Sequence, residues 1–148
     1  MVTKKYKLLK TDTKKNVFGK TLYRIKALMS FGTVTKGDLG GYIEKEKNLS
    51  HNENAWVFGN AMIFEDAKVS ENAWIYGDAK VSGNATISGD AAISGDATIY
   101  GNATIYGNAM ISGRYDISVN VDYEFKRIKI NTEEKALKLK KFLDEFDG

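Results

Sequence analysis

The hydrophobic pattern repeats every six residues between Asn54 and Gly113. A β-branched aliphatic residue follows each alanine of this repeat by two positions, an Asn or Asp precedes it, and a Gly or Glu precedes that. The alanines stand at positions 55, 61, 67, 73, 79, 85, 91, 97, 103 and 109. A strict period of this length is typical of a parallel β-helix. It predicts an all-β solenoid, a left-handed parallel β-helix, with the aliphatic residue and the alanine pointing inward.

Three six-residue sides close one triangular coil of 18 residues, so the repeat predicts a little over three coils. The Gly-Asn and Gly-Asp pairs are expected at the corners, where the backbone needs a positive φ that glycine adopts freely and that Asn and Asp tolerate. Positions 18 apart are then expected to share one face. Trp56, Phe58, Trp74 and Tyr76 fall on the first face, Tyr100 on the second and Tyr106 on the third.

The combined apolar area of the aromatic residues on the first face exceeds the area that a monomer usually exposes. There are two ways in which this face could be covered. The N-terminal segment could fold over this face, or another protein chain could bind there, since Trp and Tyr are frequent anchors at interfaces. The candidate interface residues are Trp56, Phe58, Trp74, Tyr76, Tyr100 and Tyr106.

The segments on either side of the repeat are expected to cover its two open ends. Residues 1–48 predict a β cap in which strands Lys5–Lys10 and Val17–Ala27 flank a polar turn, Thr11–Asn16. A glycine-rich loop, Lys36–Ile43, would seat this cap against the first coil, with the repeat unit itself spanning 49–113. Residues 114–148 predict a second cap made of strands followed by a helix over Thr132–Phe146, whose apolar stripe would close the last coil or mediate self-association.

The amino-acid composition limits the kinds of chemistry that the chain can perform. The chain has 148 residues and no cysteine, which excludes disulfides and thiol chemistry. The first residues are hydrophilic and no long apolar run follows, which predicts a soluble cytoplasmic protein without a signal peptide or membrane span. The Asn and Asp columns at the corners are read as turn residues that bond to backbone amides. We therefore expect no metal and no cofactor.

Charge is distributed unevenly behind the net value of +3. Residues 1–48 carry 12 Lys or Arg against 4 Asp or Glu, or +8, whereas residues 49–113 carry 2 against 7, or −5. A basic cap on an acidic body is compatible with a nucleic-acid partner. Lysines that keep edge strands from aggregating would give the same pattern.

His51, the single histidine, is the candidate for catalysis. A histidine can act as general base when a carboxylate orients it, and Glu53 is close in sequence. It precedes the first coil, and no long loop interrupts the repeat to enclose a substrate.

Several blocks of sequence resemble the YdcK-type family of bacterial and phage proteins. They are Leu22-Tyr-Arg-Ile-Lys-Ala-Leu, Phe31-Gly, Gly37-Asp-Leu-Gly-Gly-Tyr-Ile-Glu-Lys-Glu, Asn48-Leu-Ser and the Asn-Ala-Trp-Val that opens the repeat. The resemblance covers roughly residues 20–113. It implies a bacterial or phage origin and an N-terminal cap leading into a left-handed β-helix. Members commonly carry a transferase label that derives from the hexapeptide repeat, which is an analogy of fold.

Two functions are therefore open. The leading hypothesis is a non-catalytic binding or scaffold protein that presents β-helix faces to a protein partner or to a second copy of itself, in a phage to a host factor. The alternative is a hexapeptide-repeat acyltransferase that uses acyl-CoA with His51 as the base.

Overall fold

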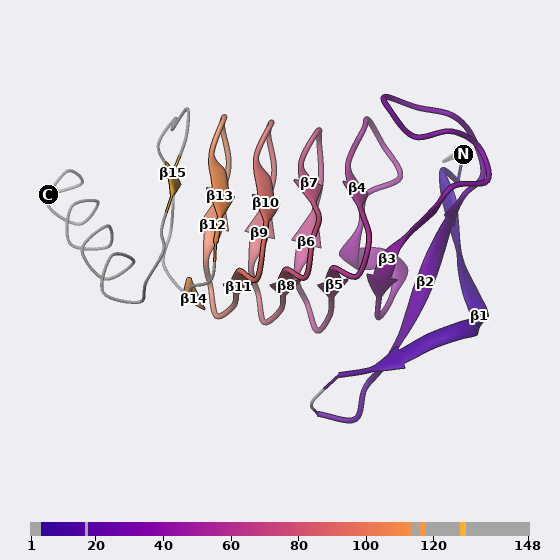
Figure 1. Ribbon diagram of the computed structural model, residues 1–148, viewed down its shortest axis with the longest axis horizontal. Helices are drawn as coiled ribbons and strands as arrows, with labels where there is room; N and C mark the ends of the chain where they lie inside the picture. Colours follow the sequence, from indigo (N-terminus) through magenta and orange to yellow (C-terminus); the bar gives the residue numbers. More distant parts are fainter. Residues whose placement is uncertain (1–3, 17, 114–115, 118–127, 130–148) are drawn as a thin grey trace, which may run out of the picture.

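The computed structural model describes residues 4–16, 18–113, 116–117 and 128–129. Parallel strands stack into a β-solenoid with three walls, and an antiparallel hairpin lies at its N-terminal end (Figure 1). Wall A contains, in order, β3 (Leu39–Ile43), β5 (Met62–Ile63), β8 (Lys80–Val81), β11 (Thr98–Ile99) and β14 (Asp116–Ile117). Wall B contains β4 (Trp56–Val57), β7 (Trp74–Ile75), β10 (Ala92–Ser94), β13 (Met110–Ser112) and β15 (Ile128–Lys129). Wall C contains β6 (Lys68–Val69), β9 (Thr86–Ile87) and β12 (Thr104–Ile105).

The strand register confirms the prediction that residues 18 apart share a wall. Trp56 pairs with Trp74, and Ile93 with Ile111, in parallel ladders. The five strands of wall A define four turns, slightly more than the little over three that were predicted. The difference arises because β3 and β14, which lie outside the repeat, also join this wall. The turn that β3 opens is longer, since Tyr42 pairs with Met62, 20 positions away.

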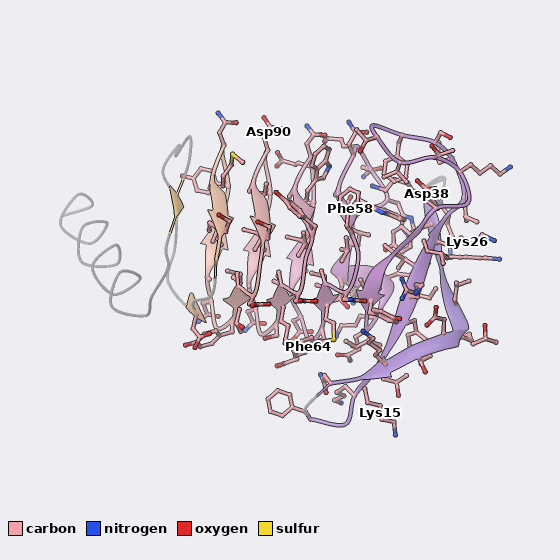
Figure 2. All side chains as sticks on the ribbon, in the orientation of Figure 1. Lys15, Lys26, Asp38, Phe58, Phe64 and Asp90 are labelled. Carbon is pink, nitrogen blue, oxygen red and sulfur yellow. The ribbon has the colours of Figure 1, made fainter. Side chains whose placement is uncertain are left out.

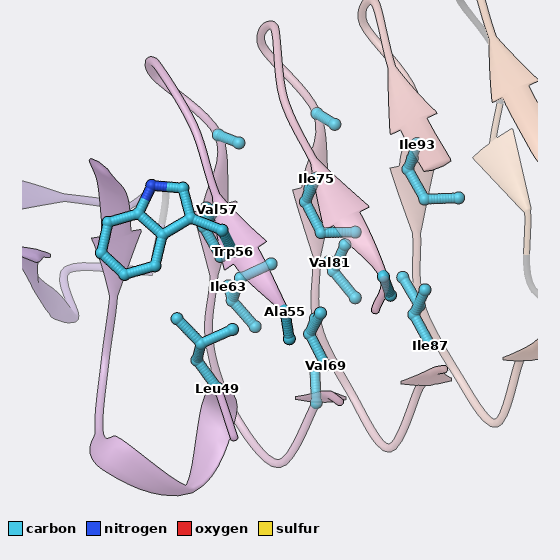
Figure 3. Close-up of a cluster of buried hydrophobic side chains, with 14 of the residues drawn as sticks. Leu49, Ala55, Trp56, Val57, Ile63, Val69, Ile75, Val81, Ile87 and Ile93 are labelled. Atoms are coloured by element: carbon cyan, nitrogen blue, oxygen red, sulfur yellow. The ribbon is translucent and has the colours of Figure 1, made fainter. Parts of the chain in front are cut away.

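The interior is a dry column of aliphatic residues and alanines, as the repeat predicted. The inward β-branched residue and the alanine of every repeat are buried, and Figure 3 shows several of these side chains stacked from turn to turn. Ile75, Ile87 and Ile93 are each 0% exposed. Burial of one such side chain stabilises the fold by about 1.5–3 kcal/mol, so this column is the main source of stability of the solenoid.

The corner residue with positive φ is the one that precedes each Asn or Asp, and no described Asn or Asp shares this conformation. Glycine occupies this position in most repeats, for example Gly77 with φ +72°. In or beside the first turn of the repeat, however, Glu53, Glu65 and Glu71 adopt φ values of 56–57°. The left-handed conformation costs a non-glycine residue about 1–2 kcal/mol, so these corners are strained relative to the later ones.

The N-terminal hairpin consists of β1 (Tyr6–Lys15) and β2 (Thr21–Ala27), and β2 pairs in turn with β3. The polar turn predicted at Thr11–Asn16 is wrong, because strand β1 continues through most of it. The chain reverses at residues 16–20 instead. There the side-chain oxygen of Asn16 accepts hydrogen bonds from the backbone amides of Phe18 and Lys20, at 2.9 and 3.0 Å. Such a side chain stabilises a turn locally, which moves the reversal toward the glycine at position 19.

The glycine-rich segment is partly a strand, whereas the sequence predicted a loop. Gly40 and Gly41 lie in β3 and are both buried. A Cβ added at Gly41 would lie 2.5 Å from the carbonyl oxygen of Ala61, and one at Gly40 would lie 2.5 Å from that of Val57. Glycine is therefore required here by close backbone approach. The predicted role of the segment, which is to seat the cap against the first turn, is fulfilled by this contact.

One short 3-10 helix, η1 (Glu46–Asn48), lies between β3 and β4. In the described part of the chain, no helix is both long and apolar enough to cross a membrane. The predicted helix over Thr132–Phe146 lies outside the described residues, as does most of the strand pair predicted before it.

Candidate functional site

His51 lies between the hairpin and the first turn, and its ring is held from several sides. Its Nδ1 accepts a hydrogen bond from the backbone amide of Lys5 at 3.0 Å. In a neutral imidazole the proton is then on Nε2. The ring stacks on Tyr6, with a centroid distance of 4.1 Å and an interplanar angle of 11°. A carboxylate oxygen of Glu46 lies 3.7 Å from Nε2. The carboxylate facing the ring thus belongs to Glu46, whereas the sequence suggested Glu53.

Burial lowers the pKa of His51 below its ordinary value, and the nearby lysines add to this effect while Glu46 opposes it. The imidazole is therefore neutral at pH 7. Its Nε2 is buried and has no hydrogen-bond partner among the described residues. Because Nδ1 is occupied and Nε2 faces the protein, neither nitrogen is placed to take a proton from a substrate outside the chain. In this arrangement His51 fastens β1 to the first turn.

Lys5 and Tyr6 complete this attachment, and sequence reasoning treated the lysine only as part of a solvated basic cap. The Lys5 ammonium donates to the carbonyl of Ala55 at 2.7 Å and to that of Glu53 at 3.2 Å. It also lies 4.5 Å from the centre of the Phe31 ring. Desolvation lowers its pKa to about 8, against the opposing charge of Glu53. The buried ammonium thus donates hydrogen bonds to carbonyl groups at the end of the solenoid, where no preceding turn is present to pair with them.

The Tyr6 hydroxyl donates within this same attachment. Its acceptors are the carbonyls of Leu49, at 2.5 Å, and Glu46, at 3.0 Å. Burial raises the pKa of this phenol well above its usual range, and the negative charge of Glu46 adds to the effect. The hydroxyl therefore remains a neutral donor in the folded protein, and it fixes β1 above η1.

Trp56 is 1% exposed and therefore is not part of an open surface. Phe31 packs against it edge to face at 5.3 Å, and Tyr6 does so at 6.2 Å. The N-terminal segment thus covers this one aromatic residue, which was one of the two alternatives that the sequence left open. The cover ends there, because Trp74 in the next turn of the same wall is only half-buried.

Three aromatic residues of wall B form one cluster outside the cap. Phe58 lies 5.8 Å from Trp74 and 6.4 Å from Tyr76, in edge-to-face geometry, and Figure 2 shows where Phe58 lies on the wall. The Trp74 indole N–H donates to the carbonyl of Asn54 at 3.3 Å, which fixes the ring orientation. All three side chains are half-buried, so the cluster offers a preorganised aromatic surface to solvent.

Tyr100 and Tyr106 do not belong to this cluster. They follow strands β11 and β12, and therefore lie on walls A and C. They are 41% and 38% exposed. Four of the six candidate interface residues thus lie on wall B, one of them buried and three half-buried, and the other two lie on walls A and C.

Wall B carries no charged side chain at its outward positions over residues 56–112. Beyond the aromatic cluster, these positions hold Ala92, Ser94, Met110 and Ser112. At the same position of the repeat, walls A and C carry the exposed lysines Lys80 and Lys68. The corners that border wall B carry Asp78, Asp90 and Asp96. An uncharged centre within a charged rim is the anatomy of a protein interface.

Comparison with models of known protein families gave no match to this chain, and comparison with curated proteins likewise gave none.

Proposed function

We propose that this protein is a non-catalytic binding or scaffold protein that uses wall B to contact a protein surface. That surface is a second copy of the chain or, in a phage setting, a host protein. The observation that carries the proposal is that wall B alone combines a cluster of half-buried aromatic residues with an absence of charged outward side chains over residues 56–112.

Physical chemistry favours this wall over the other two. Desolvation of a lysine at the centre of an interface costs free energy unless it finds a partner, and walls A and C both carry one. Wall B requires no such compensation. Its half-buried Trp74 and Tyr76 are of the residue types that contribute most to binding at interfaces. Because Phe58 and the carbonyl of Asn54 already hold the Trp74 ring, little conformational entropy is lost on binding.

A charge placed at the centre of wall B tests the proposal. Ala92→Lys introduces an ammonium at an outward position, and the fold tolerates lysine at the equivalent positions Lys68 and Lys80. The matched control is Thr104→Lys on wall C. We expect the wall B variant to weaken self-association, measured by sedimentation over a concentration series, or capture of a partner, at least tenfold. The control should behave as wild type.

Tryptophan fluorescence provides a second measurement, because the chain has only two tryptophans. In a Trp56→Phe background, emission reports on Trp74 alone. We expect binding to shift this emission to shorter wavelength and to reduce quenching by acrylamide. A protein that remains monomeric, captures no partner and shows unchanged Trp74 emission would contradict the proposal.

A further inference from the structure

The hairpin of β1 and β2 is the most strongly charged element of the described structure. It carries six lysines at outward or partly outward positions: Lys7, Lys10, Lys14, Lys15, Lys20 and Lys26. Its one carboxylate, that of Asp12, is bonded to the Nε of Arg24 at 2.7 Å and therefore does not neutralise a lysine. In the part of the chain that the structure describes, none of the six lysines forms an ion pair.

The hairpin is also accessible. Strand β1 is the first strand of its sheet and has a pairing partner on one side only, β2. Figure 1 shows the far end of the hairpin extending beyond the solenoid, and Figure 2 places Lys15 near that end and Lys26 toward the base. Phe18, in the turn between the strands, is 72% exposed. The positive charge therefore extends from the projecting two-stranded end of the hairpin to its base, where β2 also pairs with β3.

Protection of a sheet edge does not account for this distribution. Edge protection needs charges on β1 alone, but Lys20 and Lys26 lie in the turn and on β2. Lys7 is paired directly with Lys26 across the two strands. Like charges in such a pair destabilise a sheet, so this arrangement gains from an anionic partner.

We propose that the β1–β2 ribbon binds the phosphate backbone of duplex DNA, with its projecting end lying in the major groove. A two-stranded β-ribbon fits that groove, which is about 12 Å wide. The seven residues of β2 pair with β1 across a bulge between Leu9 and Thr13, so the ribbon spans about 23 Å at about 3.3 Å per residue, and duplex DNA presents phosphates continuously over such a length.

The two-sided placement of the lysines selects a groove over a flat anionic surface. Lys14 and Lys15 are consecutive in a strand, so their side chains point to opposite faces. A lipid surface can meet only one face or the tip of the ribbon, whereas the walls of a groove place phosphates on both sides. This binding is independent of wall B, which the hairpin leaves open beyond Trp56.

Salt dependence of binding to a labelled DNA duplex, followed by fluorescence anisotropy with the full-length protein, tests the proposal. If six phosphates are contacted, affinity should fall roughly 2,000-fold between 50 and 200 mM salt. Lys7→Gln combined with Lys26→Gln should reduce that fall to roughly 150-fold, because two fewer counterions are released. Lys68→Gln combined with Lys80→Gln removes the same net charge from the solenoid walls and should leave the salt dependence unchanged.

Three results would overturn the proposal. The first is no binding to the duplex at low salt by a protein whose circular dichroism is that of the fold. The second is an equal loss in both double variants, which would assign binding to net charge alone. The third is binding to vesicles that contain phosphatidylserine, lost in Phe18→Ser, without binding to DNA. That result would assign the ribbon to a membrane surface.

Discussion

The N-terminal cap and the repeated turns are held together by different kinds of interaction. In the turns, one backbone hydrogen bond recurs at the same place on every level, such as Trp74 N to Ala91 O at 2.9 Å. The cap depends on single side-chain contacts. Arg24, for example, binds Asp12 at 2.7 Å and the carbonyl of Gly40 at 2.9 Å. Each cap residue is therefore specified individually, whereas residues of the turns are specified by their position in the repeat.

The two regions also differ in which amino-acid substitutions they tolerate. A repeated turn accepts many outward residues, because Lys, Thr, Ala and Trp all occur at the same outward position. Its corners accept very few, since the backbone of the next turn lies directly above. In the cap, the positions least tolerant of substitution are those where a side chain or a glycine contacts the end of the solenoid.

The largest effect is expected at the junction of the two regions. Gly41→Ala places a Cβ 2.5 Å from the carbonyl oxygen of Ala61 and 2.6 Å from a methyl group of Val57. Because that backbone belongs to the next turn and cannot move freely, the loss in the free energy of unfolding should be about 3 kcal/mol or more. Urea unfolding measures it. Gly37→Ala, with no atom within 4 Å of the added Cβ, should lose only about 1–2 kcal/mol from its positive φ.

Two corners of the repeat permit a comparison at almost constant backbone conformation. Gly59 and Gly77 have φ values of +61° and +72°, so replacement by alanine strains both similarly. An added Cβ would lie 3.7 Å from Gly77 O at the first corner, but 2.9 Å from Gly95 N at the second. We expect Gly77→Ala to cost about 1–3 kcal/mol more than Gly59→Ala in thermal unfolding. Equal costs would show that the larger clearance around the added Cβ at Gly59 has no energetic consequence.

Loss of one hydroxyl tests the attachment of the cap. Tyr6→Phe removes the donor to the buried carbonyl of Leu49 and keeps the ring that stacks on His51. The expected loss is about 1–2 kcal/mol, because the carbonyl is left unpaired. Tyr23→Phe is the control, since its hydroxyl has no hydrogen bond to the described residues and its ring contact with Lys10 is retained. A larger loss for the control would contradict the role given to Tyr6.

The smallest expected effect is a pH dependence of the same attachment. The pKa of His51 is lower in the folded protein than its ordinary value of 6.5, so the unfolded chain binds a proton more readily. This contribution to stability is complete above pH 6.5 and is lost as pH falls toward the folded pKa. Protonation also removes Nδ1 as an acceptor for Lys5 N. The melting temperature should therefore decrease between pH 7.5 and pH 5.5 more steeply in wild type than in His51→Phe.

The aromatic cluster could be predicted only in part. The register places Trp56 and Trp74 one above the other, as their spacing of 18 indicates. No spacing rule indicates that Phe31 and Tyr6 cover the first of them and stop short of the second. That boundary is set by Tyr6 at the start of β1 and by Phe31 in the segment after β2, and both contacts lie outside the repeat.

By itself the sequence determined the solenoid, its three walls and the residues that line its interior. It could do so because every turn places the same residue types at the same positions. The weak conformational preference of any one residue becomes unambiguous when it recurs in every repeat. Only the tertiary structure decided the position of Lys5 over the open carbonyls, the enclosure of His51 and the exposure of wall B beyond the cap. Each of these features occurs once, and the contacts behind them join residues about 50 positions apart. Contacts of this kind produce no periodic pattern in the sequence from which they could be predicted.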